Sequence, residues 1–572
     1  MDKDKQTITF NESVKDKTIK LQDDQSITRI EDLSTELFVT IFSYLDCYEI
    51  YTAFSNLNYR FQQLLNSSRP LYKIQLNIAT YRETFTNNYK QFLLDNSRNI
   101  YFMQLSAHLE NGQFLLSLII NSSMSSLQSL HIYYIHSNLL VPILDKLTAL
   151  PRLFSLSFII ANTYENIDHI YQLIFALPKL KSISLTINSI HSQSNLLTYT
   201  KKRQNTIEYL SINHQISVDQ LFDILTYTLQ ICRLKVHETE IYNRHIHREL
   251  PIELINLRHI SIGKFNGNLN HFEKFLSEIS CKLTYLYINL TCGENTFLNG
   301  DQWKRLILQY LPELKKHHLG FNNRFHERIE YSIDSTPSDS FNTSFWIERQ
   351  DVLEIQIFTS CIQYFIHRYK KRWYNDMPNN IVNSSVELSK STRLTIVFIN
   401  PNASHDIARV FTRHLSIIVH IYHLEIQIND FLFQTLFKIM RLVPELITLK
   451  IRSLSSDRSI DLSYTDLLEE NPEQYRNKIA KIYLETMSHI EEFYLLLELC
   501  PSMTYFKVDH THPMNIEHVL RSILIKINND HNDHLRLLCF RIPTSKNGDN
   551  TIAKLEKMIN DENLLLDYEI KR

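Results

Sequence analysis

Three close pairs of histidines are the first residues in this chain that could bind a metal ion. They are His245 with His247, His317 with His318, and His510 with His512. A zinc site needs three or four Cys, His or carboxylate ligands at suitable spacing. None of the pairs has such a partner, and 25 histidines in 572 residues produce close pairs by chance. We therefore expect no metal site.

Motifs for catalysis and for nucleotide binding are also missing from the sequence. It contains no G-x-S-x-G elbow, and none of its seven glycines belongs to a G-x-G-x-x-G or G-x-x-x-x-G-K-[ST] loop. Such loops supply the backbone N–H groups that hold phosphates, so the usual dinucleotide and P-loop sites are not expected. We expect a protein that is not an enzyme and that has no cofactor.

One basic and aromatic run, His367 to Trp373, has the residue types that grip phosphates and stack on bases. The formal net charge of the chain is only −2, so no global field attracts nucleic acid. We interpret the run as a solvated helix face with one core aromatic residue, and docking of an acidic or phosphorylated partner is the alternative. We expect no nucleic acid as a partner.

Cysteine usage and hydropathy indicate where the protein resides. The seven cysteines are scattered, odd in number and never in a C-x-x-C pair, which is typical of reduced thiols in a cytoplasmic or nuclear protein. No apolar run approaches the ~18 residues of a membrane span, so we expect no membrane partner. Residues 1–28 are polar and lack the apolar core of a signal peptide, and we expect a disordered leader.

Residues 30–65 have the apolar spacing of three short helices. The first run is expected to present one apolar face, with Ser34 as its N-cap, and the next two runs follow directly. Those faces comprise Leu33, Leu37, Ile41, Phe42 and Leu45; Ile50, Ala53, Phe54 and Leu57; and Phe61, Leu64 and Leu65. About 35 residues cannot bury a large core alone, so the unit should dock on something else.

The order of residue types in this stretch resembles an F-box, the helical module that binds the Skp1 subunit of SCF-type ubiquitin ligases. The matching segments are Leu33-Ser34, Glu36-Leu37, Ile41-Phe42-Ser43-Tyr44-Leu45, Asp46-Cys47-Tyr48-Glu49-Ile50 and Ala53-Phe54-Ser55-Asn56-Leu57. Ser34 and Cys47 stand where proline is common, and Phe61 stands where tryptophan is usual.

The resemblance implies that residues 29–68 bind Skp1 and, through it, a cullin. The residues expected to contact Skp1 are Leu33, Glu36, Leu37, Ile41, Leu45, Ile50 and Leu57. The alternative is an ordinary three-helix cap on a larger domain.

After residue 70 the template apolar-x-x-apolar-x-apolar repeats along the chain. It begins at Leu71, Ile100, Leu127, Leu153, Leu180, Ile207, Ile231, Leu257, Leu283 and Leu314, at intervals of 24 to 31 residues. Helix-spaced apolar runs lie between these segments. Such a period is typical of leucine-rich repeats, with one strand and one helix in each unit, and the match is to the divergent repeats of F-box proteins.

The predicted fold class is α/β: a three-helix F-box followed by a leucine-rich-repeat solenoid with a parallel concave sheet and outer helices. Regular repeats are expected over residues 69–325, irregular repeats with an insertion over 326–420, and further repeats with a C-terminal cap over 421–572. Later templates are expected at Val352/Ile355/Ile357, Leu394/Val397/Ile399, Ile421/Leu424/Ile426, Leu446/Leu449/Ile451, Met503/Phe506/Val508 and Leu535/Leu538/Phe540, with a polar insertion at 453–477.

Polar and aromatic residues alternate with the apolar positions of the predicted strands and should face away from the helices. Tyr, His and Asn side chains combine contact area with hydrogen bonding, so they suit protein recognition. We expect a protein substrate of unknown identity to bind His131, Tyr133, Tyr209, Asn213, His259, Tyr285 and Tyr287. The predicted function is substrate recognition for an SCF-type ligase, and the alternative is a repeat scaffold with no link to ubiquitination.

Overall fold

The structure is a computed structural model that describes most of the chain, in two compact units. The described residues are 30–67, 70–75, 86–107, 116–117, 124–161, 167–187, 205–241, 252–291, 297, 299–324, 339–341, 343–358, 361–368, 370, 392–397, 421–455, 478–511, 514–530, 532, 534–541 and 548–564. The first unit comprises Met1–Met103 with Ser123–Leu127, and the second comprises Gln104–Ser122 with Gln128–Arg572. The predicted leader, His245, His247, His512, Trp373, the whole segment 456–477 and most of the segment 371–420 lie outside the described residues.

Three short helices open the first unit, each with a side-chain cap. Helix α1 (Thr35–Phe42) begins after Ser34, whose hydroxyl accepts a hydrogen bond from the Leu37 N–H, as predicted. Helix α2 (Cys47–Phe54) begins with a capping box in which Asp46 and Glu49 each accept from the other's N–H at 2.8 Å. Asn58 caps helix α3 (Tyr59–Leu65). These caps satisfy N–H groups that a helix start otherwise leaves unpaired.

Aromatic side chains from the three helices form the core of this unit. The rings of Phe38 and Phe61 lie 4.9 Å apart, and those of Phe42 and Phe54 lie 5.1 Å apart, all four buried. The remainder of the unit consists of β1 (Tyr72–Gln75), α4 (Asn87–Asp95) and the start of β2 (Ile100–Ser106). In β1 the core residue is Tyr72 and not the predicted Leu71, which is exposed.

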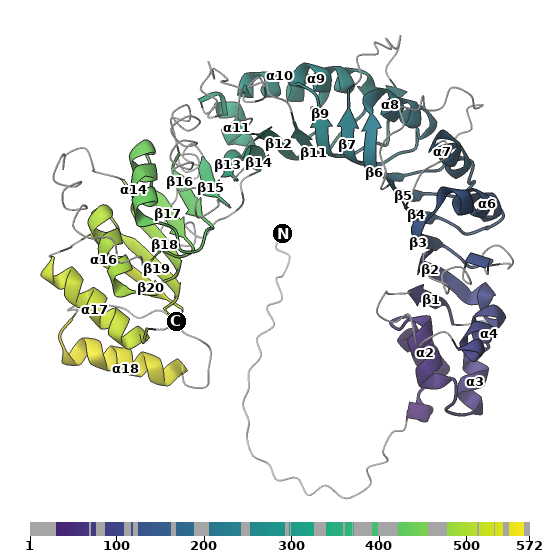
Figure 1. The fold of residues 1–572 in the computed structure, drawn as a ribbon, viewed down its shortest axis with the longest axis horizontal. Coiled ribbons are helices and arrows are strands. Elements are labelled where there is room, and N and C mark those ends of the chain that lie inside the picture. The colour runs from purple at the N-terminus through teal and green to yellow at the C-terminus, as the bar shows by residue number, and fades with distance from the viewer. Residues whose placement is uncertain are drawn as a thin grey trace, which may run out of the picture. The chain divides into compact units, whose positions relative to one another are not determined.

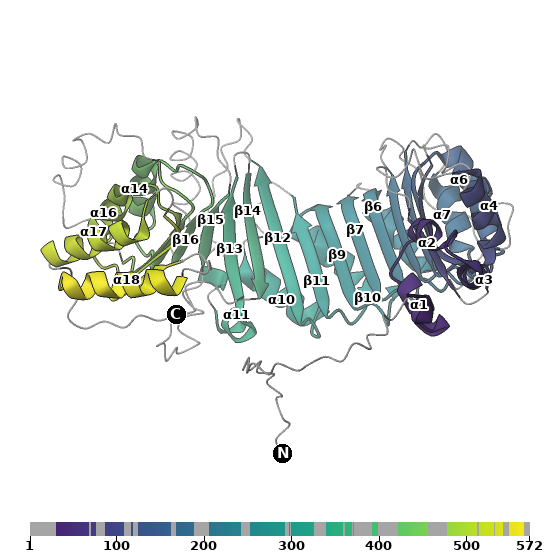
Figure 2. The same cartoon turned by 90° about the horizontal axis from the view of Figure 1, so that it is seen from below.

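The second unit begins with alternating strands and helices. They are β3 (Ser129–Ile135), α6 (Ser137–Leu147), β4 (Ser155–Ile160), α7 (Ile167–Phe175), β5 (Ser182–Ile187), β6 (Tyr209–Ser217), α8 (Val218–Tyr227), β7 (Arg233–Glu240), β9 (His259–Asn266), α9 (Leu269–Ser277), β11 (Tyr285–Leu290), α10 (Gly300–Tyr310) and β12 (Lys316–Arg324). A separate small pair joins β8 (Ile252–Glu253) and β10 (Ile279–Ser280). Within this unit the helices lie along one side of the strands (Figures 1 and 2).

The repeat template accounts for the register of these strands. The middle template residue of each repeat pairs with its counterpart in the next, in the order Leu130, Leu156, Ile183, Leu210, Leu234, Ile260 and Leu286. All of these side chains are buried. Apolar residues on alternate strand positions therefore meet the helices, as predicted for a sheet that packs on one face.

The region after β12 departs from the repeat. After α11 (Ser344–Arg349), β13 (Asp351–Ile357) and β14 (Cys361–Arg368) form an antiparallel pair, and β14 inserts between β12 and β13. The prediction of a helix face beginning at His367 is therefore wrong, because His367 and Arg368 end a strand. Strand β15 (Arg393–Ile396) then pairs parallel with β13.

Parallel strands with intervening helices complete the unit. They are β16 (His423–Ile426), α14 (Phe433–Leu442), β17 (Thr448–Ile451), β18 (Lys481–Thr486), α16 (Ile490–Leu499), β19 (Tyr505–His510), α17 (Ile516–Asn529), β20 (Leu537–Phe540) and α18 (Gly548–Asp561). Two expectations need correction. Leu394 was expected to be the first residue of its template, but it pairs with Leu424 and is therefore the middle residue. Strand β18 belongs to a repeat, Ile479/Ile482/Leu484, that was not predicted.

The fold class α/β with a large, mostly parallel sheet is confirmed. The final helix α18 packs on α17 through Leu524, Leu555 and Met558, consistent with the predicted C-terminal cap. Among the described residues, no helix combines the length and apolar composition that crossing a bilayer requires.

Candidate functional site

Helix α1 has two apolar stripes, and only one of them is in the core. Phe38 and Phe42 point inward, whereas the Leu37 side chain is 50% exposed and Ile41 is half-buried. Leu33 and Leu45, just outside the helix ends, are also half-buried. Leu37 and Ile41 lie four residues apart on one side of α1, and Leu33 and Leu45 precede and follow the helix. We call these four residues the apolar row.

The other residues expected to contact Skp1 fall in different environments. Glu36 is exposed, and Leu57, in the turn after α2, is 53% exposed. Ile50 is fully buried, so we correct that expectation: its side chain has no exposed surface for a partner.

Two residues near the apolar row were not singled out from the sequence. Among the described residues of the unit, Tyr44 is the most exposed large apolar side chain, and its spacing of three from Ile41 could have identified it. Arg60 donates to the backbone carbonyls of Glu31 and Leu33, the latter at 2.6 Å, and its guanidinium lies 5.9 Å from the Phe38 ring centre. Arg60 thereby fixes the chain that leads into the apolar row.

In the second unit, the predicted substrate residues share the face of the sheet that no described helix covers, which we call the helix-free face. Register places Tyr209, Arg233, His259, Tyr285 and Lys316 in one row across β6, β7, β9, β11 and β12. A parallel row comprises His131, Ser157, Ser184, Ser211, Lys235, Ser261, Tyr287 and His318. The seven predicted side chains are all half-buried.

Only some of these side chains lie close together. The rings of His259 and Tyr285 are stacked with centres 5.5 Å apart, and Tyr287 is two residues further along the same strand. Asn213 donates to Ser184 and Thr186 at 3.1 and 3.2 Å. His131 and Tyr133, on β3, are separated from Tyr209 by three strand spacings, about 14 Å, and do not join that group.

The adjacent residues His317 and His318 point to opposite faces of β12 and cannot bind one metal ion together. His318 stacks on Tyr287, with centres 4.8 Å apart, and on His367 of β14 at 6.0 Å. Burial, followed by the nearby His367, lowers the pKa of His318 to about 4. His367 thus belongs to the same surface as the predicted strand residues, a proximity that the sequence did not indicate.

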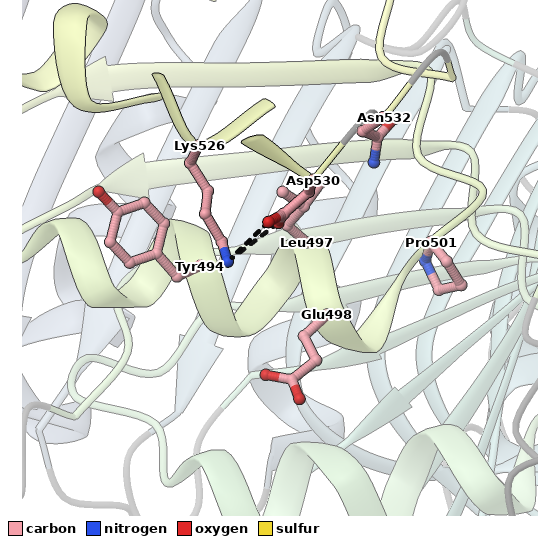
Figure 3. Close-up of a pocket in the computed structure, with 7 residues that line it drawn as sticks. All are labelled: Tyr494, Leu497, Glu498, Pro501, Lys526, Asp530 and Asn532. Atoms are coloured by element: carbon pink, nitrogen blue, oxygen red, sulfur yellow. Dashed lines mark hydrogen bonds and ion pairs between the residues drawn. The ribbon is translucent and has the colours of Figure 1, made fainter. Parts of the chain in front are cut away.

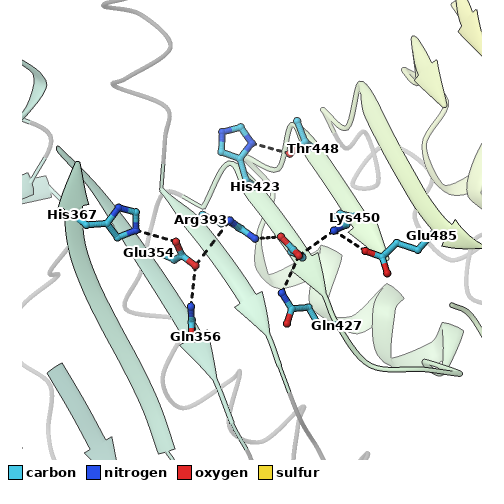
Figure 4. Close-up of polar contacts among 10 residues, drawn as sticks. Glu354, Gln356, His367, Arg393, His423, Gln427, Thr448, Lys450 and Glu485 are labelled. Atoms are coloured by element: carbon cyan, nitrogen blue, oxygen red, sulfur yellow. Dashed lines mark hydrogen bonds and ion pairs between the residues drawn. The ribbon is translucent and has the colours of Figure 1, made fainter. Parts of the chain in front are cut away.

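From His367 onward, the helix-free face carries alternating charges, one strand after another (Figure 4). His367 Nε2 lies 3.1 Å from Glu354, Arg393 lies between Glu354 and Glu425, and Lys450 lies between Glu425 and Glu485 at 3.3 and 2.7 Å. Gln356 donates to Glu354 at 3.0 Å, and Gln427 donates to Glu425 at 2.9 Å. We call Glu354, Arg393, Glu425, Lys450 and Glu485 the charge ladder.

The charged groups of the ladder are paired with one another. The side chains of Glu354, Arg393 and Glu425 are each only 10% exposed, and each contacts an opposite charge on a neighbouring strand. Little of their charge remains for a ligand, so we assign the ladder to cross-strand stabilisation. His423 adds a hydrogen-bonding contact of 2.8 Å to Thr448 next to it.

On the helix side, a buried pair joins His317 and Asp351, with Nε2 and Oδ2 3.3 Å apart. Burial, assisted by Arg349, lowers the pKa of His317 to about 3, and burial raises the pKa of Asp351 to about 6. Trp346 packs against the imidazole and Arg349 contacts Asp351 at 3.2 Å. None of these four contacting residues offers a nucleophilic hydroxyl or thiol, so the pair fits a structural role.

A pocket of about 380 Å³ lies beside α16 and α17 (Figure 3). Its lining residues are Tyr494, Leu497, Glu498, Pro501, Lys526, Asp530 and Asn532. Lys526 and Asp530 pair with each other at 2.9 Å, and both are partly exposed. The cationic group is thus already engaged, and the lining contains no arrangement of nucleophile and base.

Within the described part of the chain, no group of three or more His, Cys, Asp and Glu residues is arranged to hold a metal ion. The described cysteines form no disulfide, and burial raises the pKa of the Cys47 thiol to about 12. No protein-family model and no curated protein matches this chain.

Proposed function

We propose that this protein is a substrate-recognition adaptor of an SCF-type ubiquitin ligase. In this proposal α1–α3 form an F-box that binds Skp1 and, through it, a cullin, and the second unit is a leucine-rich-repeat solenoid that binds a target protein. The chain performs no chemistry itself and acts by holding the target close to the ubiquitin-charged enzyme. Such a protein would act in the cytoplasm or the nucleus.

The observation that supports the proposal best is the apolar row on α1. A short helix that packs on a small core normally buries its largest apolar residues. Here the aromatic side chains fill that core, and the Leu37 side chain remains half exposed. Burying a leucine completely is worth about 1.5–3 kcal/mol, so covering the row would give a partner several kcal/mol of binding energy. Exposed apolar residues that lie together are typical of a protein interface.

A pull-down with purified Skp1 tests the proposal. Wild-type protein should bind, and the double substitution Leu37→Asp with Ile41→Asp should abolish binding, because it places two charges in the row. Leu308→Asp is the matched control, since Leu308 is 59% exposed on α10 of the other unit. Circular dichroism should show that all three proteins keep their helix content. A wild type that does not bind, or a double variant that binds as well as the control, would refute the proposal.

The second candidate is a repeat scaffold in which α1–α3 only cap the chain. The observation in its favour is that α2 packs on α4: Tyr48 and Tyr51 lie 5.3 and 5.1 Å from the ring of Tyr89. Deleting residues 30–65 should then expose Tyr89 and Tyr72 and lower stability sharply. An adaptor should tolerate the deletion better and lose Skp1 binding, so thermal unfolding and the pull-down of the truncated chain distinguish the two candidates.

A further inference from the structure

Positive charge is concentrated on one part of the helix-free face. Arg233 and Lys235 of β7 and Lys316 of β12 are exposed, and the strand register places them in the two rows of this face. No described carboxylate forms an ion pair with any of these three residues. Glu238, also on β7, is engaged by Lys264 and accepts from Asn266 at 2.9 Å.

The charge of this region differs from that of the strands on either side. Toward β3 the corresponding positions are mainly serines, such as Ser155, Ser157 and Ser184, which carry no charge. Toward β18 the charge ladder pairs each cation with carboxylates. Unpaired cations therefore mark the surface over β7, β9, β11 and β12, which we call the basic surface.

The aromatic residues of the basic surface favour a protein ligand over a nucleic acid. Binding of single strands depends on ring faces that are free to stack on bases. Here His259 stacks on Tyr285, and His318 lies between Tyr287 and His367, so these rings already stack on one another. Burial lowers the pKa of His259 and His318, so the positive charge at neutral pH comes from the arginine and the lysines.

The spacing of the cations indicates which acidic group they fit. Arg233 and Lys316 are three strand spacings apart, about 14 Å, and Lys235 is about 7 Å along the strand from Arg233. Charge-assisted hydrogen bonds need contacts of about 3 Å, so one phosphate cannot engage all three. Several separate carboxylates along an extended chain can.

We propose that the basic surface binds an extended protein segment rich in aspartate and glutamate. The identity of that segment as the target of a ligase rests on the function proposed above, but its binding does not. Carboxylates would pair with Arg233, Lys235 and Lys316, and the stacked rings would pack against the segment's backbone and apolar atoms.

Fluorescence anisotropy of the full chain with labelled probes tests this proposal. The probes are a Glu-Ser repeat peptide, a Gln-Ser repeat peptide, a neutral peptide with one phosphoserine, and oligo(dT). The Glu-Ser peptide should bind at low salt and outcompete the other three probes. At physiological salt its binding should weaken by about tenfold or more, because screening shortens the range of the charge attraction as ionic strength rises.

A matched pair of charge reversals locates the site. Combining Arg233→Glu, Lys235→Glu and Lys316→Glu should weaken Glu-Ser binding by more than about tenfold. Combining Lys146→Glu, Lys179→Glu and Lys438→Glu makes the same change in net charge at exposed positions outside the basic surface, and should weaken binding by less than about twofold. Equal losses in both variants, no binding of the Glu-Ser peptide, or tighter binding of oligo(dT) or phosphoserine would overturn the proposal.

Should the triple reversal unfold, Arg233→Gln alone must still weaken binding. Failure of the Skp1 pull-down leaves this measurement untouched, because no Skp1 is present in it. An acidic peptide that binds a chain unable to bind Skp1 would thus refute the adaptor function and support the basic surface.

Discussion

Glu425 is the residue whose neutralisation tests the charge ladder most directly. Its carboxylate faces Arg393 on one neighbouring strand and Lys450 on the other, at 3.3 Å from the lysine, and accepts from Gln427 at 2.9 Å. Glu425→Gln keeps the size of the side chain and removes its charge. Arg393 and Lys450 would then remain largely buried with one carboxylate fewer to pair with.

The stability that Glu425→Gln should lose follows from the burial of the charged groups and from the contacts that remain. Removing one partner of a buried ion pair costs about 3–5 kcal/mol. Lys450 keeps Glu485 at 2.7 Å, and Arg393 keeps Glu354 at 4.0 Å, so we expect the lower end, about 3 kcal/mol. Arg393→Met should relieve part of that loss, with a coupling of about 1–3 kcal/mol in a double-mutant cycle, because it removes one of the cations left behind.

The control uses the same substitution in an exposed pair. Lys181 and Glu208 are 2.7 Å apart with side chains about half exposed, so Glu208→Gln should cost less than about 1 kcal/mol. Urea unfolding gives the free energies, and hydrogen exchange of the β15–β17 amides detects local opening, since repeat arrays can unfold in segments. Glu425→Gln within about 0.5 kcal/mol of wild type, or a cycle with no coupling, would refute a stabilising ladder.

Three further predictions concern single residues. Burial lowers the pKa of His214 to about 4, so between that value and 6.5 the unfolded chain binds the proton and the folded chain does not; stability should therefore rise with pH across this window, by up to about 3 kcal/mol, and urea midpoints of His214→Gln should lack that part of the slope. Gly263→Ala would place its Cβ 2.7 Å from the backbone oxygen of His237 on the adjacent strand, so it should lower the free energy of unfolding by about 1–3 kcal/mol in the same assay, and an unchanged value would contradict this close approach. Asp46→Ala removes the capping box of α2 and should cost about 1 kcal/mol by thermal unfolding, most of which Asp46→Asn should restore.

The sequence predicted the apolar face of the sheet well because each repeat places the same residue type at the same depth. One error occurred where a strand departs from the template. Leu394, Val397 and Ile399 fit the template in the sequence, but pairing with Leu424 makes Leu394 the middle residue, and the position three residues before it is a serine. Strand β14 was not predicted. Its buried positions Ile362, Tyr364 and Ile366 alternate with Gln363 and Phe365, and because Phe365 is also apolar the alternation is incomplete in the sequence.

The candidate site on α1 was predictable only in part. Helical spacing identifies both apolar stripes of this helix but does not say which one packs inward. Phe38 and Phe42 occupy the core because their rings fill it together with Phe54 and Phe61, and this leaves Leu37 and Ile41 outside. Ile50 has the same residue type as Ile41, and only the packing of the three helices buries the first completely and leaves the second half-buried.

The two faces of the sheet explain why the repeat predicts the fold more easily than the function. Residues on the helix side are apolar in most repeats, because a polar residue there loses its hydration unless it has a buried partner, as His317 and Asp351 have in each other. Residues on the helix-free face have no such constraint. They change from serines on β4 and β5 to cations on β7, and then to the charge ladder, which begins on β13. Binding specificity can therefore vary from one strand to the next without altering the register, and the place where unpaired charge accumulates, at Arg233, Lys235 and Lys316, is where a partner gains most from this face.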